Sequence, residues 1–456
     1  MNTMNQCIRS SGLRAVVVAT AIVLLAVGSA GAQARIDGIT GTSFSFSAGA
    51  GEISTPDGSS LHFWGYEDTT GVANPFGVPQ YPGPTLIVNQ GDTVTVSLTN
   101  NLPIATGGTT PVQNVSIVFP GQVVTAAGTT DGLLTKESTG PADTVTYTFT
   151  ATNPGTYMYH SGTEMDLQVE MGLVGALIVR PSMGEGFAYN DADTKFDHEY
   201  LFLMTQMDPL IHQAVEQQRF DDVDMTEYLA VYWFFNGRAG PDDLGDAFVS
   251  WLPHQPYNCV PRMTPGQKLL MRVIGGDQGY HPFHYHGNNA DIIARDGRLL
   301  ANPRSQFTTL SVPGETVDQI FTWTGAGMGW DMYGHQQDVD NEPLGNFPET
   351  EDVDHNGNGI FDNVAMQPGE DPADHGLPFP VTLPENQNLA FGGWWSGSPY
   401  LGSDAPLPPG EGGLNPNSGY FFMWHSHAEK ELTNWDIFPG GMLSMMVVEP
   451  PGTQIP

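Results

Sequence analysis

Short runs rich in β-branched and aromatic residues recur along the chain, separated by glycine and proline. They predict strands at 44–46, 61–66, 85–88, 93–99, 115–118, 144–149, 156–159 and 174–179, then at 200–204 and 229–235 with Asn236-Gly237 as a turn. β-branched and aromatic residues favour strands, and glycine and proline mark turns. The strands of the first half are enough for one ordinary β-sandwich. The pattern therefore predicts an all-β fold.

The second half of the chain repeats the first. Residues 90–99 are echoed by 265–274, and residues 155–181 by 419–450. Two copies of one sandwich are the simplest account of such a repeat. We therefore expect a first domain at 35–182 and a second at 183–456.

One long insertion, at about 325–418, distinguishes the second copy and is rich in Gly, Pro, Asp and Asn. We expect it to form loops. Oxygen-bearing side chains alternate within it at Asp354, Asn356, Asn358 and Asp362, around Gly359. Calcium prefers six to eight oxygen ligands, and a glycine allows the sharp turn that such a loop needs. A structural calcium site is one interpretation, and a solvated acidic turn is the other.

The first 34 residues have the features of a secretory signal. Arg9 and Arg14 precede an apolar run at 15–27 that is short for a membrane span, and small residues follow it. We expect export to the periplasm or the medium, and no further membrane span. Cys7 would leave with the signal, so that Cys259 remains alone as a buried small hydrophobe.

The chain is strongly acidic, with 50 Asp and Glu against 15 Lys and Arg and a formal net charge of −35. This charge argues against nucleic acid or an anionic membrane as a partner. It favours metal cations or a basic redox partner protein. Adaptation to a salty medium is an equally simple explanation, since an acidic surface also maintains solubility.

Two His-x-His pairs are the main chemical signal, at His284 and His286 and at His425 and His427. Residues two apart on a strand point to the same side. If the two strands face each other, four imidazoles share one volume, and imidazole suits copper, zinc, iron or nickel. The alternative is chance or local hydrogen bonding. Two pairs, each beside an aromatic strand and a glycine turn, favour a metal site.

Several motifs resemble the cupredoxin domains of multicopper oxidases. They lie at 81–85, 91–93, 154–161, 172–175, 281–287 and 425–442. The resemblance covers about 38–450 except the insertion, and implies two tandem cupredoxin-like Greek-key sandwiches. With two domains the chain is similar to two-domain laccases and copper nitrite reductases. Those relatives are trimers with copper sites between subunits, so the resemblance implies a homotrimer.

The resemblance also implies what the chain lacks. A blue type 1 copper takes two His, one Cys and often a Met, and these positions fall on His281, Ser426, Glu431 and Met442. Because a blue centre needs the cysteine sulfur, we expect none here. His281 would then form local hydrogen bonds instead.

The trinuclear copper cluster of the family uses four His-x-His pairs. The first pair falls on Val118 and Pro120, and the second on His160 and Gly162. The surviving candidates for copper are five: His160, His284, His286, His425 and His427. The resemblance implies a partial type 3-like pocket with His284 beside it, completed by water or by a carboxylate such as Glu164 or Glu429.

Three functions are consistent with these residues. The first is an oxidoreductase whose type 2 or type 3-like copper acts on a small substrate, a metal ion or oxygen. The second is a non-catalytic copper-binding or assembly protein on the same scaffold, since a fold does not fix a function. A nitrite reductase-like site, in which His160 meets His284 or His286 across a subunit boundary, ranks last because the thiolate relay is missing.

Overall fold

The computed structural model describes residues 36–323, 419–449 and 453–455. It also describes the backbone of three short strands, β21 (Gln336–Gln337), β22 (Pro343–Leu344) and β23 (Gly397–Ser398). The predicted signal and the predicted calcium loop lie outside the described residues. Within them, no helix is long and apolar enough to cross a membrane.

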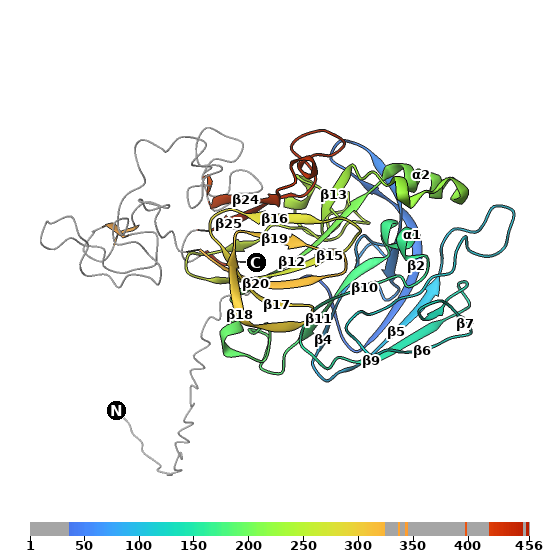
Figure 1. The fold of residues 1–456 in the computed structure, drawn as a ribbon, viewed down its shortest axis with the longest axis horizontal. Helices are drawn as coiled ribbons and strands as arrows, with labels where there is room; N and C mark the ends of the chain where they lie inside the picture. Colours follow the sequence, from blue (N-terminus) through green and yellow to red (C-terminus); the bar gives the residue numbers. More distant parts are fainter. Residues whose placement is uncertain are drawn as a thin grey trace, which may run out of the picture. The chain divides into compact units, whose positions relative to one another are not determined.

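The first sandwich consists of two sheets (Figure 1). One has the order β1 (Ile39–Thr40), β4 (Gly83–Asn89), β11 (Val174–Arg180), β10 (Gly155–His160). The other has the order β3 (Ser60–Asp68), β2 (Ser43–Ser54), β5 (Thr93–Asn100), β9 (Val145–Thr150), β6 (Thr125–Ala127). A separate ribbon pairs β7 (Thr130–Asp131) with β8 (Lys136–Glu137).

The second sandwich repeats this arrangement with larger sheets (Figure 1). One sheet has the order β13 (Tyr232–Phe235), β12 (His198–Met207), β15 (Lys268–Gly275), β20 (Thr316–Thr322), β17 (Ala290–Arg295), β18 (Arg298–Gln306). The other has the order β14 (Arg262–Met263), β25 (Leu443–Val448), β24 (Tyr420–Ser426), β16 (His281–Tyr285), β19 (Thr308–Ser311), and β23 pairs with β24. The predicted all-β fold of two tandem sandwiches is confirmed.

In the parts of the chain that the structure describes, helices are short and lie in the connections. They are α1 (Met165–Glu170), α2 (Pro209–Glu216) and the 3-10 turns η1 (Ala192–Thr194), η2 (Phe220–Asp222), η3 (Met225–Glu227), η4 (Asp242–Leu244) and η6 (Glu429–Leu432).

Each sandwich has its own apolar core, and a third core joins the two. Strand alternation fills the separate cores, as where Val94, Val96 and Leu98 of β5 are buried between less buried residues. The joining core takes Ile178 from β11 and Leu203 from β12. β11 is buried along its whole length because both its faces are covered.

Most predicted strands are confirmed, and two predictions need correction. Residues 115–118 form no strand: Val115 and Val118 make only isolated bridges, to Ser138 and His160. The strand predicted at 229–235 begins only at Tyr232. The two domains lie in one compact unit, Ala32–Pro456, and the boundary at 182/183 stays a prediction.

Candidate metal centre

Two neighbouring antiparallel strands, β16 and β24, position the histidines. Their register places His284 opposite His425 and Tyr285 opposite Trp424. Tyr285 and Trp424 are buried in the second core together with Phe283. Because successive side chains alternate across a strand, the histidines face away from that core. The apolar residues therefore fix the side on which the imidazoles lie.

The structure brings four imidazoles together. Nitrogen atoms of His284, His286 and His425 all lie within 4.8 Å of one another. The ring of His427 lies 4.9 Å from that of His284 and 5.5 Å from that of His425, centroid to centroid. The expectation that the two His-x-His pairs face each other agrees with this geometry.

The closest pair of nitrogens has the spacing of two ligands of one ion. The Nε2 atoms of His286 and His425 are 3.3 Å apart. Imidazole nitrogens bind first-row ions at about 2.0–2.1 Å, so two of them at a tetrahedral angle lie about 3.3 Å apart. The donor set therefore fits a metal such as copper or zinc.

Hydrogen bonds on the far side of the rings hold two of these histidines in position. Nδ1 of His425 lies 2.7 Å from the carbonyl oxygen of Ser426. A carbonyl can only accept, so Nδ1 carries the proton and Nε2 keeps its lone pair for a metal. Nδ1 of His284 lies 2.8 Å from the Thr308 hydroxyl. Such partners orient metal-binding imidazoles and raise their basicity.

The electrostatics keep the imidazoles of His284 and His425 neutral. Burial, with His425 and His427 nearby, lowers the pKa of His284 to about 4. Burial also lowers the pKa of His425. A neutral imidazole is the form that binds a metal, so these two residues are ready to act as ligands at neutral pH.

A buried ionic network occupies the place matched to a type 1 copper site. His281 is fully buried, with Nδ1 2.9 Å from Oε2 of Glu431 and Nε2 3.0 Å from Oδ2 of Asp277. The Ser426 hydroxyl donates to the same Glu431 oxygen at 2.5 Å. Burial alone would lower the pKa of His281, but the two carboxylates raise it to about 10. Both ring nitrogens then carry protons, and neither is free for a metal.

The remaining positions matched to that site lie beside the network. The Ser426 amide donates to the Met442 carbonyl at 3.0 Å, and the Met442 amide donates to the Glu431 carbonyl at 2.8 Å. Cys259 is buried elsewhere: its amide donates to the Asp243 carbonyl at 2.8 Å. It is the one cysteine among the described residues.

His160 does not belong to the group of three nitrogens found among the described residues. It ends β10, bridges to Val118, and has Nδ1 2.8 Å from the Ser161 carbonyl. Burial lowers its pKa. Val118 also lies against Gly162, where an added Cβ would approach it to 2.7 Å. Val118, His160 and Gly162, three of the four positions matched to the first two His pairs, therefore lie together. Only one of the three, His160, carries an imidazole.

The carboxylates predicted to complete the copper site lie on different elements. His427 is 53% exposed, and its Nδ1 lies 3.1 Å from Oε1 of Glu429. Glu164 lies just before α1 with φ of 39°. The calcium candidates Asp354, Asn356, Asn358 and Asp362 lie outside the described residues, so that site stays a prediction.

Sequence reasoning missed Asp277 and Thr308. Thr308 faces His284 across the pairing of β16 with β19, which no local pattern reveals. Asp277 lies only four residues before His281. An acidic residue so close to a candidate histidine was the available signal.

Comparisons with known proteins agree with this picture. Residues 76–184 match the family model described as Multicopper oxidase. Laccase-4 of Oryza sativa subsp. japonica is 23% identical over 68% of this chain and 50% of its own length. Copper resistance protein A of Escherichia coli is 26% identical over 52% of this chain and 41% of its length. L-ascorbate oxidase of Cucurbita pepo var. melopepo is 32% identical over 30% of this chain and 22% of its length. The chain thus spans half or less of these relatives.

Solved structures show the same fold. One described as Multicopper Oxidase mgLAC has a TM-score of 0.51 at 18% identity, covering 91% of this chain and 87% of its own. The blue copper oxidase from Nitrosomonas europaea also has a TM-score of 0.51 at 18% identity, covering 89% and 85%.

Proposed function

We propose, from the premise that this chain is a member of the multicopper oxidase superfamily, that it binds copper at His284, His286 and His425 and acts as an oxidoreductase on a small substrate. The observation that carries the proposal is the 3.3 Å spacing of the His286 and His425 Nε2 atoms. The imidazoles of His284 and His425 are neutral and are oriented by hydrogen bonds. Bound copper would supply one-electron chemistry at this position.

The protein orients the histidine rings and leaves one side of the histidine group open to a substrate. The Ser426 carbonyl and the Thr308 hydroxyl fix the rings of His425 and His284. His427 is half-exposed at the rim of the group. A small molecule can therefore approach the centre from this side, while the aromatic core closes the other.

We further propose that no blue type 1 centre forms. The serine, two carboxylates and charged imidazole at that place offer no thiolate. Without a thiolate relay, electrons would have to come directly from a substrate at the histidine group. A phenol, a reduced metal ion or a similar small reductant is the class of substrate that fits, with oxygen as acceptor.

Metal analysis of the full chain reloaded with copper tests the site. We expect one or two copper ions per chain, lost in His286→Ala/His425→Ala and retained in His62→Ala. His62 is a matched control because it lies on β3, with Nδ1 3.0 Å from Glu52. Equal copper in all three proteins, or none in any, would refute the site.

A substrate screen then separates two functions. Oxygen consumption with phenols or reduced metal ions, abolished in the double variant, supports the oxidoreductase. Copper binding without turnover of these compounds or of nitrite supports the alternative, a non-catalytic copper-binding or assembly protein. The ionic network in place of a type 1 site is the observation that favours this alternative.

We also propose that the chain is exported and forms a homotrimer in which His160 of a neighbouring copy completes the copper site. Phe307 and Leu310 are 60% and 47% exposed, and the Phe307 ring lies 5.7 Å from that of His284. Apolar side chains at the rim of a site suit a subunit contact. Light scattering should give three chains per particle, and His160→Ala should lower copper content while the particle stays intact.

N-terminal sequencing of protein from the exported fraction tests removal of the signal.

A further inference from the structure

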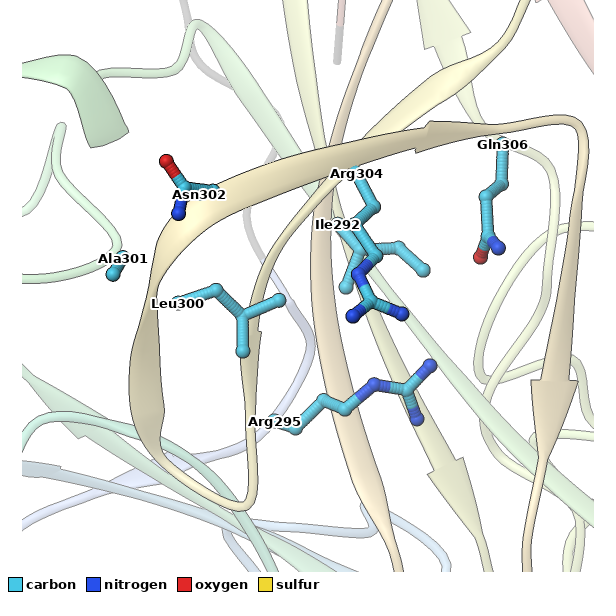
Figure 2. A pocket seen from close by; sticks show the side chains of 7 residues that line it. All are labelled: Ile292, Arg295, Leu300, Ala301, Asn302, Arg304 and Gln306. Atoms are coloured by element: carbon cyan, nitrogen blue, oxygen red, sulfur yellow. The ribbon is translucent and has the colours of Figure 1, made fainter.

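A cavity of about 380 Å³ lies between β17 and β18, on the hairpin that forms one edge of the sheet containing β12, β15 and β20. Seven residues line it: Ile292, Arg295, Leu300, Ala301, Asn302, Arg304 and Gln306. Figure 2 shows the side chains of Arg295 and Arg304 extending into the same space. Its volume is in the range of sites for small organic ligands.

The positive charge of this cavity is unusual for the chain. Only 15 residues are Lys or Arg, against 50 acidic residues, yet three arginines fall within 295–304. Arg295 pairs with Glu315. Within residues 36–323 and 419–449, the guanidinium of Arg304 has no partner. Two cations lining one space are stabilised by an anion between them, and among the described residues Arg295 alone has an acidic partner.

The floor of the cavity is apolar. Ile292 is 1% exposed and belongs to the second core, and Leu300 packs against the same core. Ala301 also lines the cavity, while Asn302 and Gln306 add polar groups. A ligand that fills this space therefore meets hydrocarbon on one side and a guanidinium on the other.

We infer that this cavity binds a small organic carboxylate with an apolar body. The planar guanidinium matches a carboxylate through two parallel hydrogen bonds. The apolar floor favours a ring or chain attached to that carboxylate over a bare anion such as phosphate. The net negative charge of the protein repels anions at long range, but physiological salt screens this repulsion beyond about 8 Å.

This site is separate from the histidine group, although the two are close in sequence. Gln306 lines the cavity, and the next residue, Phe307, packs against His284. Neighbouring residues at a strand end point to opposite sides. The cavity uses none of the histidines, so binding there needs no copper. Its test can therefore fail or succeed independently of the proposed function.

Calorimetric titration of the copper-free full chain tests the inference, with benzoate as the probe. We expect saturable binding of one benzoate per chain. Benzamide, which has the same ring without the charge, and inorganic phosphate, which has charge without the ring, should each bind at least roughly tenfold more weakly. Phosphate binding as tight as benzoate binding, or no saturable benzoate binding, would overturn the proposal.

Two variants and one control locate the site. Arg304→Gln should weaken benzoate binding roughly tenfold or more, the usual effect of losing a charge-assisted hydrogen bond. Gln306→Trp, on the same side of β18 as Arg304, should block binding by filling the cavity, whatever the charge. Arg298→Gln removes the same charge from the same hairpin but does not line the cavity, so its affinity should stay within about twofold of the parent. Equal losses in Arg298→Gln and Arg304→Gln would show that general charge, and not this cavity, holds the anion.

Discussion

At the scale of single residues, His281 shows how the same side chain takes a role opposite to that of its neighbours. His284 lies three residues further along and is neutral, with a pKa lowered to about 4. His281 lies between two carboxylates, which raise its pKa to about 10 against burial. The partners of each imidazole, and not the residue type, decide whether it binds metal or a proton.

The raised pKa of His281 predicts a pH dependence of stability. The folded protein holds this proton up to about pH 10, whereas the unfolded chain releases it near the ordinary value of 6.5. The contribution to the free energy of unfolding is therefore complete below pH 6.5 and lost as the pH rises through 10. Urea denaturation across this range should show the decline. His281→Gln should flatten it; an unchanged slope in that variant would contradict the assignment.

The ionic network around His281 lies at the place matched to a type 1 copper site, which predicts that it can be converted into one. Ser426→Cys with Glu431→His would place two imidazoles and a thiolate beside Met442, the ligand set of blue copper. We expect the copper-loaded double variant to turn blue, and Ser426→Cys alone to remain without the intense band because Glu431 still holds His281. Absorption spectra of both proteins test this. A colourless double variant with bound copper would show that the backbone here does not support a type 1 site.

At the scale of elements, α2 depends on Asp208, the residue directly before it. Asp208 accepts from the Leu210 amide at 2.9 Å and from the Leu229 amide at 2.8 Å. It therefore caps the helix and ties it to the following loop, and Pro209 supplies a favourable first position.

Asp208→Ala should lower the free energy of unfolding by about 2 kcal/mol, since it removes a cap and a second hydrogen bond. Urea denaturation measures this. Asp224→Ala removes a similar cap, from the Thr226 amide of the exposed η3, and should change stability little. An equal loss in both variants would mean that the contact with Leu229 contributes nothing.

The elements that the sequence predicted are those set by local composition. Strands such as β5 follow from alternation alone. Residues 115–118 have strand composition but pair only through single bridges, because their partners are fixed by the tertiary fold. The short α2 was missed, since eight residues around a cap carry little periodic signal.

The candidate metal centre also divides into features that the local sequence predicts and features that only the tertiary fold determines. The spacing of the His-x-His pairs predicted which imidazoles share a side. The register that places His284 opposite His425 joins strands more than a hundred residues apart, and composition does not encode it. The same holds for His281 and Glu431, which are 150 residues apart. Whether His160 reaches the group depends on how copies assemble, which lies beyond one chain.

At the scale of the whole molecule, a buried charge network joins the two sandwiches. Arg272 of β15 is fully buried and contacts Glu199 of β12 at 3.0 Å. It also reaches Thr156 of the first sandwich at 2.9 Å. Glu199 binds Arg180, which ends the last strand of that sandwich. Because these charges sit beside the joining apolar core, their pairing requires the correct relative position of both sandwiches.

Arg272→Met should therefore cost about 3–5 kcal/mol of the free energy of unfolding, because it leaves Glu199 and the nearby Asp318 buried without their shared partner. Denaturation followed by circular dichroism measures the loss. Arg219→Met breaks an ion pair whose side chains are 46% and 55% exposed, and should have little effect because exposed pairs contribute little. If the two variants lose the same stability, the joining apolar core alone determines the relative position of the two sandwiches. If only Arg272→Met is destabilised, the charges help to set how the sandwich that carries the histidine group meets its partner.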